Sequence, residues 1–346
     1  MRIAQVAPLY ESVPPTLYGG TERIVSYLTE ELVRQGHDVC LFASGDSRTS
    51  AQLVPMRACS IRLDRSCRDP LAAHIVMIEQ VIAQQHRFDL IHYHIDYLHY
   101  PVSRRGITPH VTTLHGRLDL PELGPIYDEF AEMPVISISD AQREPLPQAN
   151  WIGTVHHGIP ASLCAFSPGG SGYLAFLGRI SPEKRTDRAI QIATRCGRPL
   201  KIAAKVDNVD RDYFEACIKP LLTNPLVEFV GEISDAEKPA FLGGADALLF
   251  PIDWPEPFGL VMIESLACGT PVIAYRGGSV EEIVAEGVTG FVVTDIPAAA
   301  AAVERAIALD RHRGRDVFER RFTAARMAAD YVNLYTQIVV NAAAAA

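Results

Sequence analysis

The stretch that decides the fold is PIDWPEPFGLVMIESLACGTPVIAYRGGS, residues 251–279. It contains two glutamates, Glu256 and Glu264, that stand eight positions apart. Glu256 follows a proline and precedes another, which indicates an open loop. The apolar run that begins at Phe258-Gly259-Leu260 and stops at Gly269 predicts a helix of about ten residues, and 270–275 predicts a buried strand. One carboxylate therefore precedes the helix and the other lies inside it.

On this helix Glu264 shares a face with apolar side chains, namely Leu260, Ile263, Ala267 and Cys268. A carboxylate on such a face would be costly without a partner. A ligand with hydroxyl donors, such as a sugar or a ribose, would satisfy it, and the free amides at the helix start near Gly259 would face the same ligand. The alternative is that Glu264 turns to solvent and that Glu256 is an ordinary loop acid.

The Glu-x7-Glu pattern inside EPFGLVMIESLACGTPVIA resembles the signature of the family 4 retaining glycosyltransferases. These enzymes move a sugar from a nucleotide donor to an acceptor. The resemblance covers essentially the whole chain and is strongest in its second half. Within the family, the VPP…YGG opening and the DWPEPFG block resemble the subgroup that contains the avilamycin-pathway glycosyltransferase. The resemblance implies an α/β fold of the GT-B type: two Rossmann-like doubly wound parallel-sheet domains that face each other across a cleft.

Length, composition and charge agree with a large enzyme that does not bind nucleic acid. A chain of 346 residues exceeds the size of a single core, which predicts two domains. A net charge of −9 argues against a nucleic-acid surface. The seven cysteines are scattered without a CxxC pair, which predicts buried free thiols in a reducing compartment. Neither a signal peptide nor a transmembrane run is found, so we expect a soluble, cytoplasmic protein.

A glycine-rich turn marks the expected boundary between the domains. The run SPGGSG, residues 167–172, is the strongest linker signal in the chain. It predicts a first domain over 1–168 that binds the acceptor and a second over 169–321 that binds the nucleotide sugar. A closing helix over 322–341 is expected to pack back onto the first domain.

The first domain opens with a strand over 2–7, a helix over 22–34 and a strand over 38–43. Gly19 and Gly20, at the entrance to this helix, would let backbone amides approach a diphosphate. The alternative is a tight turn without a ligand. No GxGxxG follows, so the fingerprint of dinucleotide-dependent dehydrogenases is absent.

Histidines gather at the predicted carboxyl ends of two strands. His92, His94 and Asp96 alternate along FDLIHYHID, which predicts that they point to one side. No third metal ligand accompanies the two histidines, so we interpret them as polar lining or hydrogen-bonded core residues, with His94 and Asp96 on the acceptor side. His115 ends the next strand. By resemblance it contacts the donor sugar near the reacting carbon.

The second domain opens with a strand that leads into GRISPEKRTDRAI. Ser181 is expected to cap a helix that starts at Pro182 and ends at Gly197. Arg179 before the cap and Lys184 in the first turn match the diphosphate-binding pair of the family. By the same resemblance, the loops at Lys205 and at Gly231-Glu232 hold the nucleotide base, and Phe258, Gly259 and Leu260 line the donor site.

Two motifs depart from the family or invite another interpretation. Family members usually carry Asn-Gly and a following acid where this chain has His156-His157-Gly158. Asp210 and Asp212 resemble the metal-holding DxD of a different glycosyltransferase fold, but we expect them to cap a helix. The arginine-rich segment 47–70 is interpreted as a solvated face, with weak peripheral membrane contact as the alternative.

The resemblance implies transfer of a hexose, with retention, from a UDP-sugar or alternatively a GDP-sugar to a hydroxyl of a small-molecule, glycan or lipid acceptor. Glu264 would bind the ribose and Glu256 the transferred sugar. Arg179, Lys184 and the Gly19-Gly20 amides would stabilise the leaving diphosphate, so we expect no cofactor and no metal ion. The alternatives are a nonhydrolysing nucleotide-sugar epimerase and a noncatalytic nucleotide-sugar-binding protein.

Overall fold

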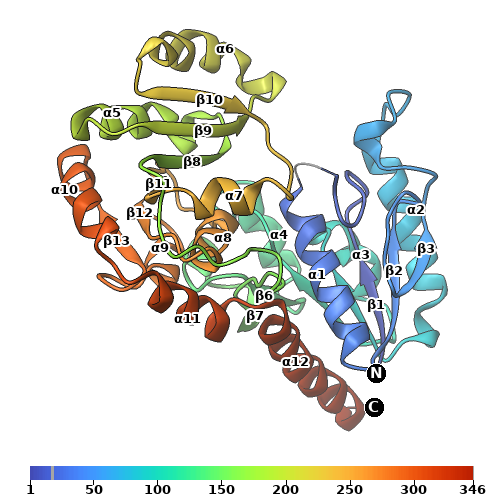
Figure 1. The fold of residues 1–346 in the computed structure, drawn as a ribbon. Helices are drawn as coiled ribbons and strands as arrows, with labels where there is room; N and C mark the ends of the chain where they lie inside the picture. Colours follow the sequence, from blue (N-terminus) through green and yellow to red (C-terminus); the bar gives the residue numbers. More distant parts are fainter. Residues whose placement is uncertain (17–18, 346) are drawn as a thin grey trace. The chain divides into compact units, whose positions relative to one another are not determined.

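The computed structural model describes residues 1–16 and 19–345 and divides into two compact units, Met1–Gly158 with Ala324–Ala346 and Ile159–Thr323 (Figure 1). These divisions differ from the boundaries expected after residues 168 and 321. The SPGGSG turn lies inside the second unit because its backbone is bonded there: Ser167 N donates to Cys268 O at 2.9 Å, and Ser171 N donates to Gly244 O at 2.7 Å.

The first unit is built on a seven-stranded parallel sheet with the order β3-β2-β1-β4-β5-β6-β7. The strands are β1 (Arg2–Val6), β2 (Asp38–Ala43), β3 (Gln52–Pro55), β4 (Leu90–Tyr93), β5 (His110–Thr113), β6 (Pro134–Ser137) and β7 (Asn150–Thr154). The central strands are buried on both faces, as the apolar sequences of β1 and β2 require.

Helices accompany this sheet: α1 (Gly20–Arg34), α2 (Pro70–Ala83), α3 (Tyr100–Ser103), α4 (Leu123–Glu129) and α12 (Ala324–Ala345). The start of α2 follows from its sequence, since Asp69 accepts hydrogen bonds from Leu71 N and Ala72 N and Pro70 occupies the first helical position. The closing helix α12 belongs to the first unit and packs beside α1 (Figure 1). Its Tyr331 and Tyr335 are fully buried.

The second unit is built on a six-stranded parallel sheet with the order β10-β9-β8-β11-β12-β13. Its strands are β8 (Leu174–Arg179), β9 (Leu200–Lys205), β10 (Val227–Gly231), β11 (Ala247–Phe250), β12 (Val272–Tyr275) and β13 (Gly290–Val293). Its helices are α5 (Thr186–Cys196), α6 (Arg211–Tyr213), α7 (Lys238–Gly243), α8 (Leu260–Ala267), α9 (Val280–Ile283), α10 (Ile296–Ile307) and α11 (Arg311–Arg321). The predicted fold class, two doubly wound parallel-sheet domains, is confirmed.

The start of α5 differs from the prediction. Pro182–Lys184 form a separate 3-10 turn, and the helix begins only at Thr186. The interruption arises at Arg185, whose backbone is left-handed (φ 53°). Lys184 is therefore not in the first turn of a helix, and its position depends on the turn that Arg185 closes.

Two other local predictions were wrong. β4 ends at Tyr93, so Asp96 does not share a strand with His92; its backbone is left-handed (φ 50°), at the start of a 3-10 turn. Asp210 makes no side-chain cap, because its carboxylate lies 3.4 Å from Arg179 Nε instead.

The cysteines are all free, but only Cys40, Cys164 and Cys268 are buried; Cys217 is exposed. No helix in the described part of the chain is long and apolar enough to cross a membrane.

Candidate active site

The predicted donor-binding residues of the second unit gather at the carboxyl edge of its sheet. Arg179 ends β8, Lys205 ends β9 and Gly231 ends β10, while Glu256 lies in the loop that follows β11. Since all the strands are parallel, their carboxyl ends meet at one edge, which is where open α/β sheets bind ligands. Glu232, just beyond β10, is exposed.

Glu256 is held by two side chains that sequence spacing did not link to it. Lys184 Nζ forms an ion pair and hydrogen bond with the Glu256 carboxylate, and Trp254 Nε1 donates to the same carboxylate at 2.9 Å. The ammonium of Lys184 also lies over the Trp254 ring, 5.1 Å from its centroid. Glu256 is only 7% exposed. The two residues predicted to meet the sugar and the phosphate are therefore in contact.

The Glu256 loop is fixed by the glycine turn that follows β12. Ser279 N donates to Glu256 O at 3.0 Å, and Ser279 Oγ donates to Phe258 O at 2.8 Å. Gly278 has a left-handed backbone (φ 54°), and a Cβ there would lie 2.5 Å from Glu256 N and closer still to its carbonyl oxygen. Glycine at 278 is thus required for the turn to approach Glu256.

Glu264 lies inside α8 and is buried, as its helical face predicted. Its partner in the structure is a residue of the chain: Lys238 Nζ, at the start of α7, lies 3.0 Å from Glu264 Oε1 and 3.0 Å from Asp235 Oδ1. A lysine of the chain thus accompanies this carboxylate, and the prediction that Glu264 also binds the donor ribose stays a prediction. Phe258 is buried, and Gly259, with φ 80°, immediately precedes the helix at Leu260.

The other predicted cations also have acidic neighbours. Arg179 Nη2 lies 2.5 Å from Glu183 Oε1, and Lys205 Nζ lies 2.8 Å from Asp207 Oδ1. Although burial opposes it, a backbone hydrogen bond and Arg179 lower the pKa of Glu183. A diphosphate at this edge would have to share these cations with carboxylates or displace them.

In the first unit the histidines form a buried hydrogen-bonded cluster. His94 Nδ1 lies 2.9 Å from His115 Nε2, and His94 Nε2 lies 2.7 Å from Gln5 Oε1. His92 bonds Tyr335 of α12 at 2.6 Å, and also Thr113 at 2.7 Å. Burial lowers the pKa of His115 to about 3, and it lowers the pKa values of His92 and His94 well below 6.5. The imidazoles are therefore neutral at pH 7.

Sequence reasoning missed several members of this cluster. His157, from the segment that departs from the family pattern, stacks on His115 with centroids 5.3 Å apart. Gln5 and Tyr335 come from β1 and α12, at opposite ends of the chain. The one available signal was the presence of buried-strand polar residues, Gln5 and His92, which must find partners.

The other first-unit residues that the sequence singled out are Asp96, Gly19 and Gly20. The side chain of Asp96 is exposed, and the neighbouring residues displace part of the water around its carboxyl group, which raises its pKa to about 6. Gly19 precedes α1 and Gly20 begins it. A Cβ at Gly19 would lie 2.8 Å from Pro15 Cβ, so close packing of the turn is by itself a reason for glycine there.

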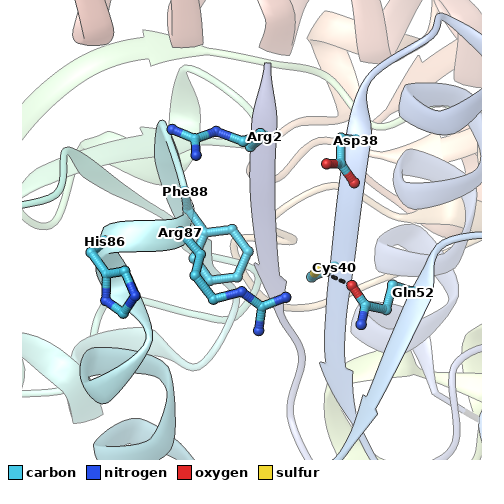
Figure 2. A pocket seen from close by; sticks show the side chains of 7 residues that line it. All are labelled: Arg2, Asp38, Cys40, Gln52, His86, Arg87 and Phe88. Atoms are coloured by element: carbon cyan, nitrogen blue, oxygen red, sulfur yellow. Dashed lines mark hydrogen bonds between the residues drawn. The ribbon is translucent and has the colours of Figure 1, made fainter.

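A pocket of about 360 Å³ lies elsewhere, at the amino-terminal edge of the first sheet (Figure 2). It is lined by Arg2, Asp38, Cys40, Gln52, His86, Arg87 and Phe88. None of these was a predicted site residue. Because open α/β sheets bind ligands at the carboxyl ends of their strands, this pocket is not the candidate active site. Among the described residues, no three or more histidine, cysteine, aspartate or glutamate side chains, the histidine cluster included, are arranged so that they could hold a metal ion.

Two family models match the chain, one for each half. Residues 18–168 match the family described as Glycosyltransferase Family 4, and residues 166–316 match the family described as Glycosyl transferases group 1.

Curated relatives include a glycogen synthase of Mycobacterium tuberculosis, 25% identical over 88% of this chain and 85% of that protein. A GDP-mannose-dependent alpha-(1-6)-phosphatidylinositol dimannoside mannosyltransferase of the same species is 35% identical over 45% of this chain and 42% of that protein.

Solved structures share the fold. AviGT4, a glycosyltransferase involved in avilamycin A biosynthesis, aligns with a TM-score of 0.77 at 23% identity and covers 98% of both chains. Sucrose-phosphate synthase from Thermosynechococcus elongatus aligns with a TM-score of 0.81 at 19% identity, over 99% of this chain and all of that one.

Proposed function

We propose that this glycosyltransferase is a retaining enzyme of the family 4 type that moves a hexose from a nucleoside-diphosphate sugar to an acceptor hydroxyl. The observation that carries the proposal is the contact of Glu256 with Lys184 and Trp254 at the carboxyl edge of the second sheet. Both Glu256 and Lys184 belong to motifs that resemble the family signature, and they come together although 72 residues separate them.

The chemistry requires stabilisation of a leaving diphosphate. In the proposed reaction, the bond between the sugar C1 and the diphosphate oxygen breaks while the acceptor oxygen attacks from the same face. The acceptor proton passes to the leaving phosphate oxygen. Lys184 and Arg179 would balance the charge that develops on that oxygen, and Glu256 would orient the sugar hydroxyls. Fixed cations at this edge support a reaction without a metal ion.

When the donor binds, its diphosphate would replace carboxylates as the partner of Lys184 and Arg179, because both cations are already paired. Lys184 already neutralises Glu256, and Arg179 already contacts Glu183. A diphosphate near Lys184 would release the Glu256 carboxylate to accept hydrogen bonds from the sugar. Through Lys184, binding of the diphosphate would thus free Glu256 to bind the sugar.

We favour a UDP-sugar as the donor. A GDP-sugar is the alternative, since a relative that is 35% identical is named for GDP-mannose. A thermal-shift screen of UDP-glucose, UDP-galactose and GDP-mannose identifies the donor class first. Incubation with acceptor pools should then release the nucleoside diphosphate and form a glycoside that retains the anomeric configuration, as read by NMR.

The same experiment separates the alternatives. A changed sugar in the incubation with donor alone would identify an epimerase. Donor binding without turnover across all acceptor pools would identify a sensor. A product with inverted configuration would overturn the retaining mechanism.

A further inference from the structure

The outer face of α2 is apolar over the first two turns of the helix. There Leu71, Ile75 and Val76 are 50%, 53% and 53% exposed. The inner face is apolar as well, because Met77 and Ile78 pack in a core cluster with side chains of β1, β2 and β4. A helix that is apolar on all sides is normally buried on all sides, and grouped exposed apolar side chains mark interaction surfaces. We therefore expect a partner to cover the outer face of α2.

Two other segments of the first unit extend this apolar surface. The ring of Tyr10, which is 46% exposed, lies 5.1 Å from the ring of His74 on α2. Arg62 N donates to Tyr10 O at 3.1 Å, which fixes the 3-10 turn Ile61–Leu63 beside Tyr10. Leu63 in this turn is 66% exposed. We call the exposed apolar side chains of the three segments the α2 patch: Tyr10, Leu63, Leu71, Ile75 and Val76.

The loop between this turn and α2 adds positive charge. Arg65 and Arg68 are exposed, and neither forms an ion pair with another described residue. The acids of the loop are already engaged: Asp64 accepts from Arg57 at 2.6 Å, and Asp69 caps the start of α2. The surface next to the α2 patch therefore offers two cations that have no partner in the described part of the chain.

An apolar surface next to unpaired arginines has the chemistry that an anionic bilayer binds. Apolar side chains enter the boundary between headgroups and acyl chains, a tyrosine ring lies at the headgroup level, and arginines pair with lipid phosphates. The net charge of the chain is −9, so attraction to an anionic surface has to be local. Glu79, exposed one turn after Val76, limits the contact to the amino-terminal half of α2.

A second copy of the chain fits this surface less well. The α2 patch consists of five side chains, whereas a stable dimer buries about 20–30 residues on each side. Membrane binding needs less apolar area, because attraction between arginines and anionic lipids adds to it.

We propose that the α2 patch docks on an anionic lipid bilayer, with Leu71, Ile75 and Val76 at the acyl boundary and with Arg65 and Arg68 on lipid phosphates. This surface belongs to the first unit alone. The inference goes beyond the proposed sugar transfer and does not depend on it.

Flotation with lipid vesicles tests the proposal on the full chain without donor or acceptor. Vesicles of phosphatidylcholine mixed with phosphatidylglycerol should bind the wild-type protein, whereas vesicles of phosphatidylcholine alone should bind much less. Added salt should release the protein, because it screens the arginines. Binding to neither vesicle, or equal binding to both, would overturn the proposal whatever reaction the enzyme catalyses.

Two double variants separate the apolar and the charged contributions. Ile75→Gln with Val76→Gln removes apolar area, and Arg65→Gln with Arg68→Gln removes two charges. Each pair should lower binding to the anionic vesicles about tenfold or more, since one arginine near such a surface contributes roughly a factor of five. All four positions are exposed, so the Tm should change little. Wild-type binding by either pair would overturn the assignment of the α2 patch.

Matched controls change similar side chains elsewhere. Val340→Gln alters a valine of α12 that is 59% exposed, and Arg313→Gln with Arg320→Gln alters two exposed arginines of α11. These variants should bind the anionic vesicles like the wild-type protein. An equal loss in the controls would show that binding is not specific to the α2 patch, which would also overturn the proposal.

Two further measurements identify what covers the patch. Amide hydrogen exchange of residues 61–76 should slow with anionic vesicles and not with neutral ones. Protection elsewhere, with none in this segment, would contradict the docking surface. Analytical ultracentrifugation without lipid should give a species that is the same in the wild type and in Ile75→Gln with Val76→Gln. A wild-type dimer that this variant dissociates would show that a second copy covers the patch and would overturn the proposal.

Discussion

Glu256 and Glu264 belong to one sequence motif, yet they have different environments in the second unit. Glu256 contacts Lys184 and Trp254 in the loop before α8, while Glu264 contacts Lys238 from within α8. Both carboxylates are buried, at 7% and 4% exposure. The separate partners agree with separate roles, one for the transferred sugar and one for the ribose.

We therefore expect different losses from the two substitutions. Glu264→Gln should weaken binding of the nucleoside diphosphate itself by roughly ten- to a hundredfold, the scale of a hydrogen bond to a charged group. Glu256→Ala should leave that binding nearly intact and lower kcat about a hundredfold. Isothermal titration and initial rates measure the two effects. Glu281→Gln, which changes a half-exposed glutamate of the same unit, is the control. Equal losses of nucleotide affinity in both variants would sink the assignment.

In the proposed reaction, Lys184 stabilises the negative charge that develops on the leaving diphosphate. Lys184→Ala should lose several kcal/mol of transition-state stabilisation, about what the loss of a charge-assisted contact costs in a closed site. The matched control is Lys219→Ala, because Lys219 is an exposed lysine that pairs with Glu215 four residues away.

Activity of the wild-type enzyme should also survive saturating EDTA. Its rate before and after chelation is the measurement. If chelation abolishes turnover and magnesium or manganese restores it, the assignment of Arg179 and Lys184 as the diphosphate-binding cations is incomplete.

At the scale of secondary-structure elements, the glycine turn before α9 decides where the Glu256 loop lies. Gly278→Ala would place a methyl group against the backbone of Glu256. Gly287 has a similar left-handed backbone (φ 69°), but there no atom of the described residues lies within 4 Å of the position that a methyl group would take. Both alanines should cost about 1–2 kcal/mol of stability from backbone strain.

Only Gly278→Ala should also lose activity, because it displaces Glu256. Thermal unfolding and initial rates of the two variants check this. If Gly287→Ala loses as much activity as Gly278→Ala, backbone strain alone explains the loss, and the contact of the new methyl group with Glu256 plays no part in it.

The sequence predicted the elements well where local patterns decide them. The strand ends that carry Arg179, Lys205 and Gly231, and the helix that buries Glu264, follow from hydrophobic periodicity and glycine stops. It could not predict the break at Arg185, because a left-handed arginine has no local signal; its side chain reaches Asp187 and Asp253, each at 2.8 Å. Tertiary contacts override local preference there.

Side-chain partners were harder to predict than elements. Lys238 meets Glu264 from 26 residues away, and Gln5 meets His94 from 89 residues away. Hydrophobic periodicity predicts which side of its own helix or strand each residue occupies, but it does not predict which other element packs against that side. The burial of Glu264 was therefore predictable, and the identity of its partner was not.

At the scale of the whole molecule, the histidines are distributed unequally between the two units. The first unit contains ten of the eleven histidines of the chain, and the second contains only His312. Burial lowers the pKa values of seven buried or largely buried histidines of the first unit: His74, His92, His94, His99, His110, His115 and His157. These side chains are neutral in the folded protein, and they gain protons near pH 6.5 once the chain unfolds.

The sign of the pH dependence follows from this difference. The unfolded state binds more protons below pH 6.5, so stability that is present above pH 6.5 is lost as the pH falls toward the lower pKa values of the folded state. Between pH 7.5 and 5.5 each such histidine removes up to about 1.4 kcal/mol. Burial raises the pKa of Glu22, which opposes part of the loss.

The second unit should respond differently over this range. Its carboxylates with lowered pKa values, Glu183, Asp187, Glu237 and Asp253, lose their stabilising contribution only as the pH falls below about 4.5. Mild acid should therefore destabilise the first unit and spare the second. A loss of several kcal/mol is a large share of the roughly 5–15 kcal/mol that stabilises a typical domain.

The two tryptophans of the chain allow each unit to be followed separately, because Trp151 lies in the first and Trp254 in the second. Trp254→Phe leaves Trp151 to report on the first unit, and Trp151→Phe leaves Trp254 to report on the second. Between pH 7.5 and 5.5 the Tm reported by Trp151 should fall by about 10 °C or more, on the scale of 2–4 °C per kcal/mol for a unit of this size. The Tm reported by Trp254 should change little. Equal shifts of the two transitions, or a larger shift at Trp254, would show that the buried histidines do not control the acid stability of this enzyme.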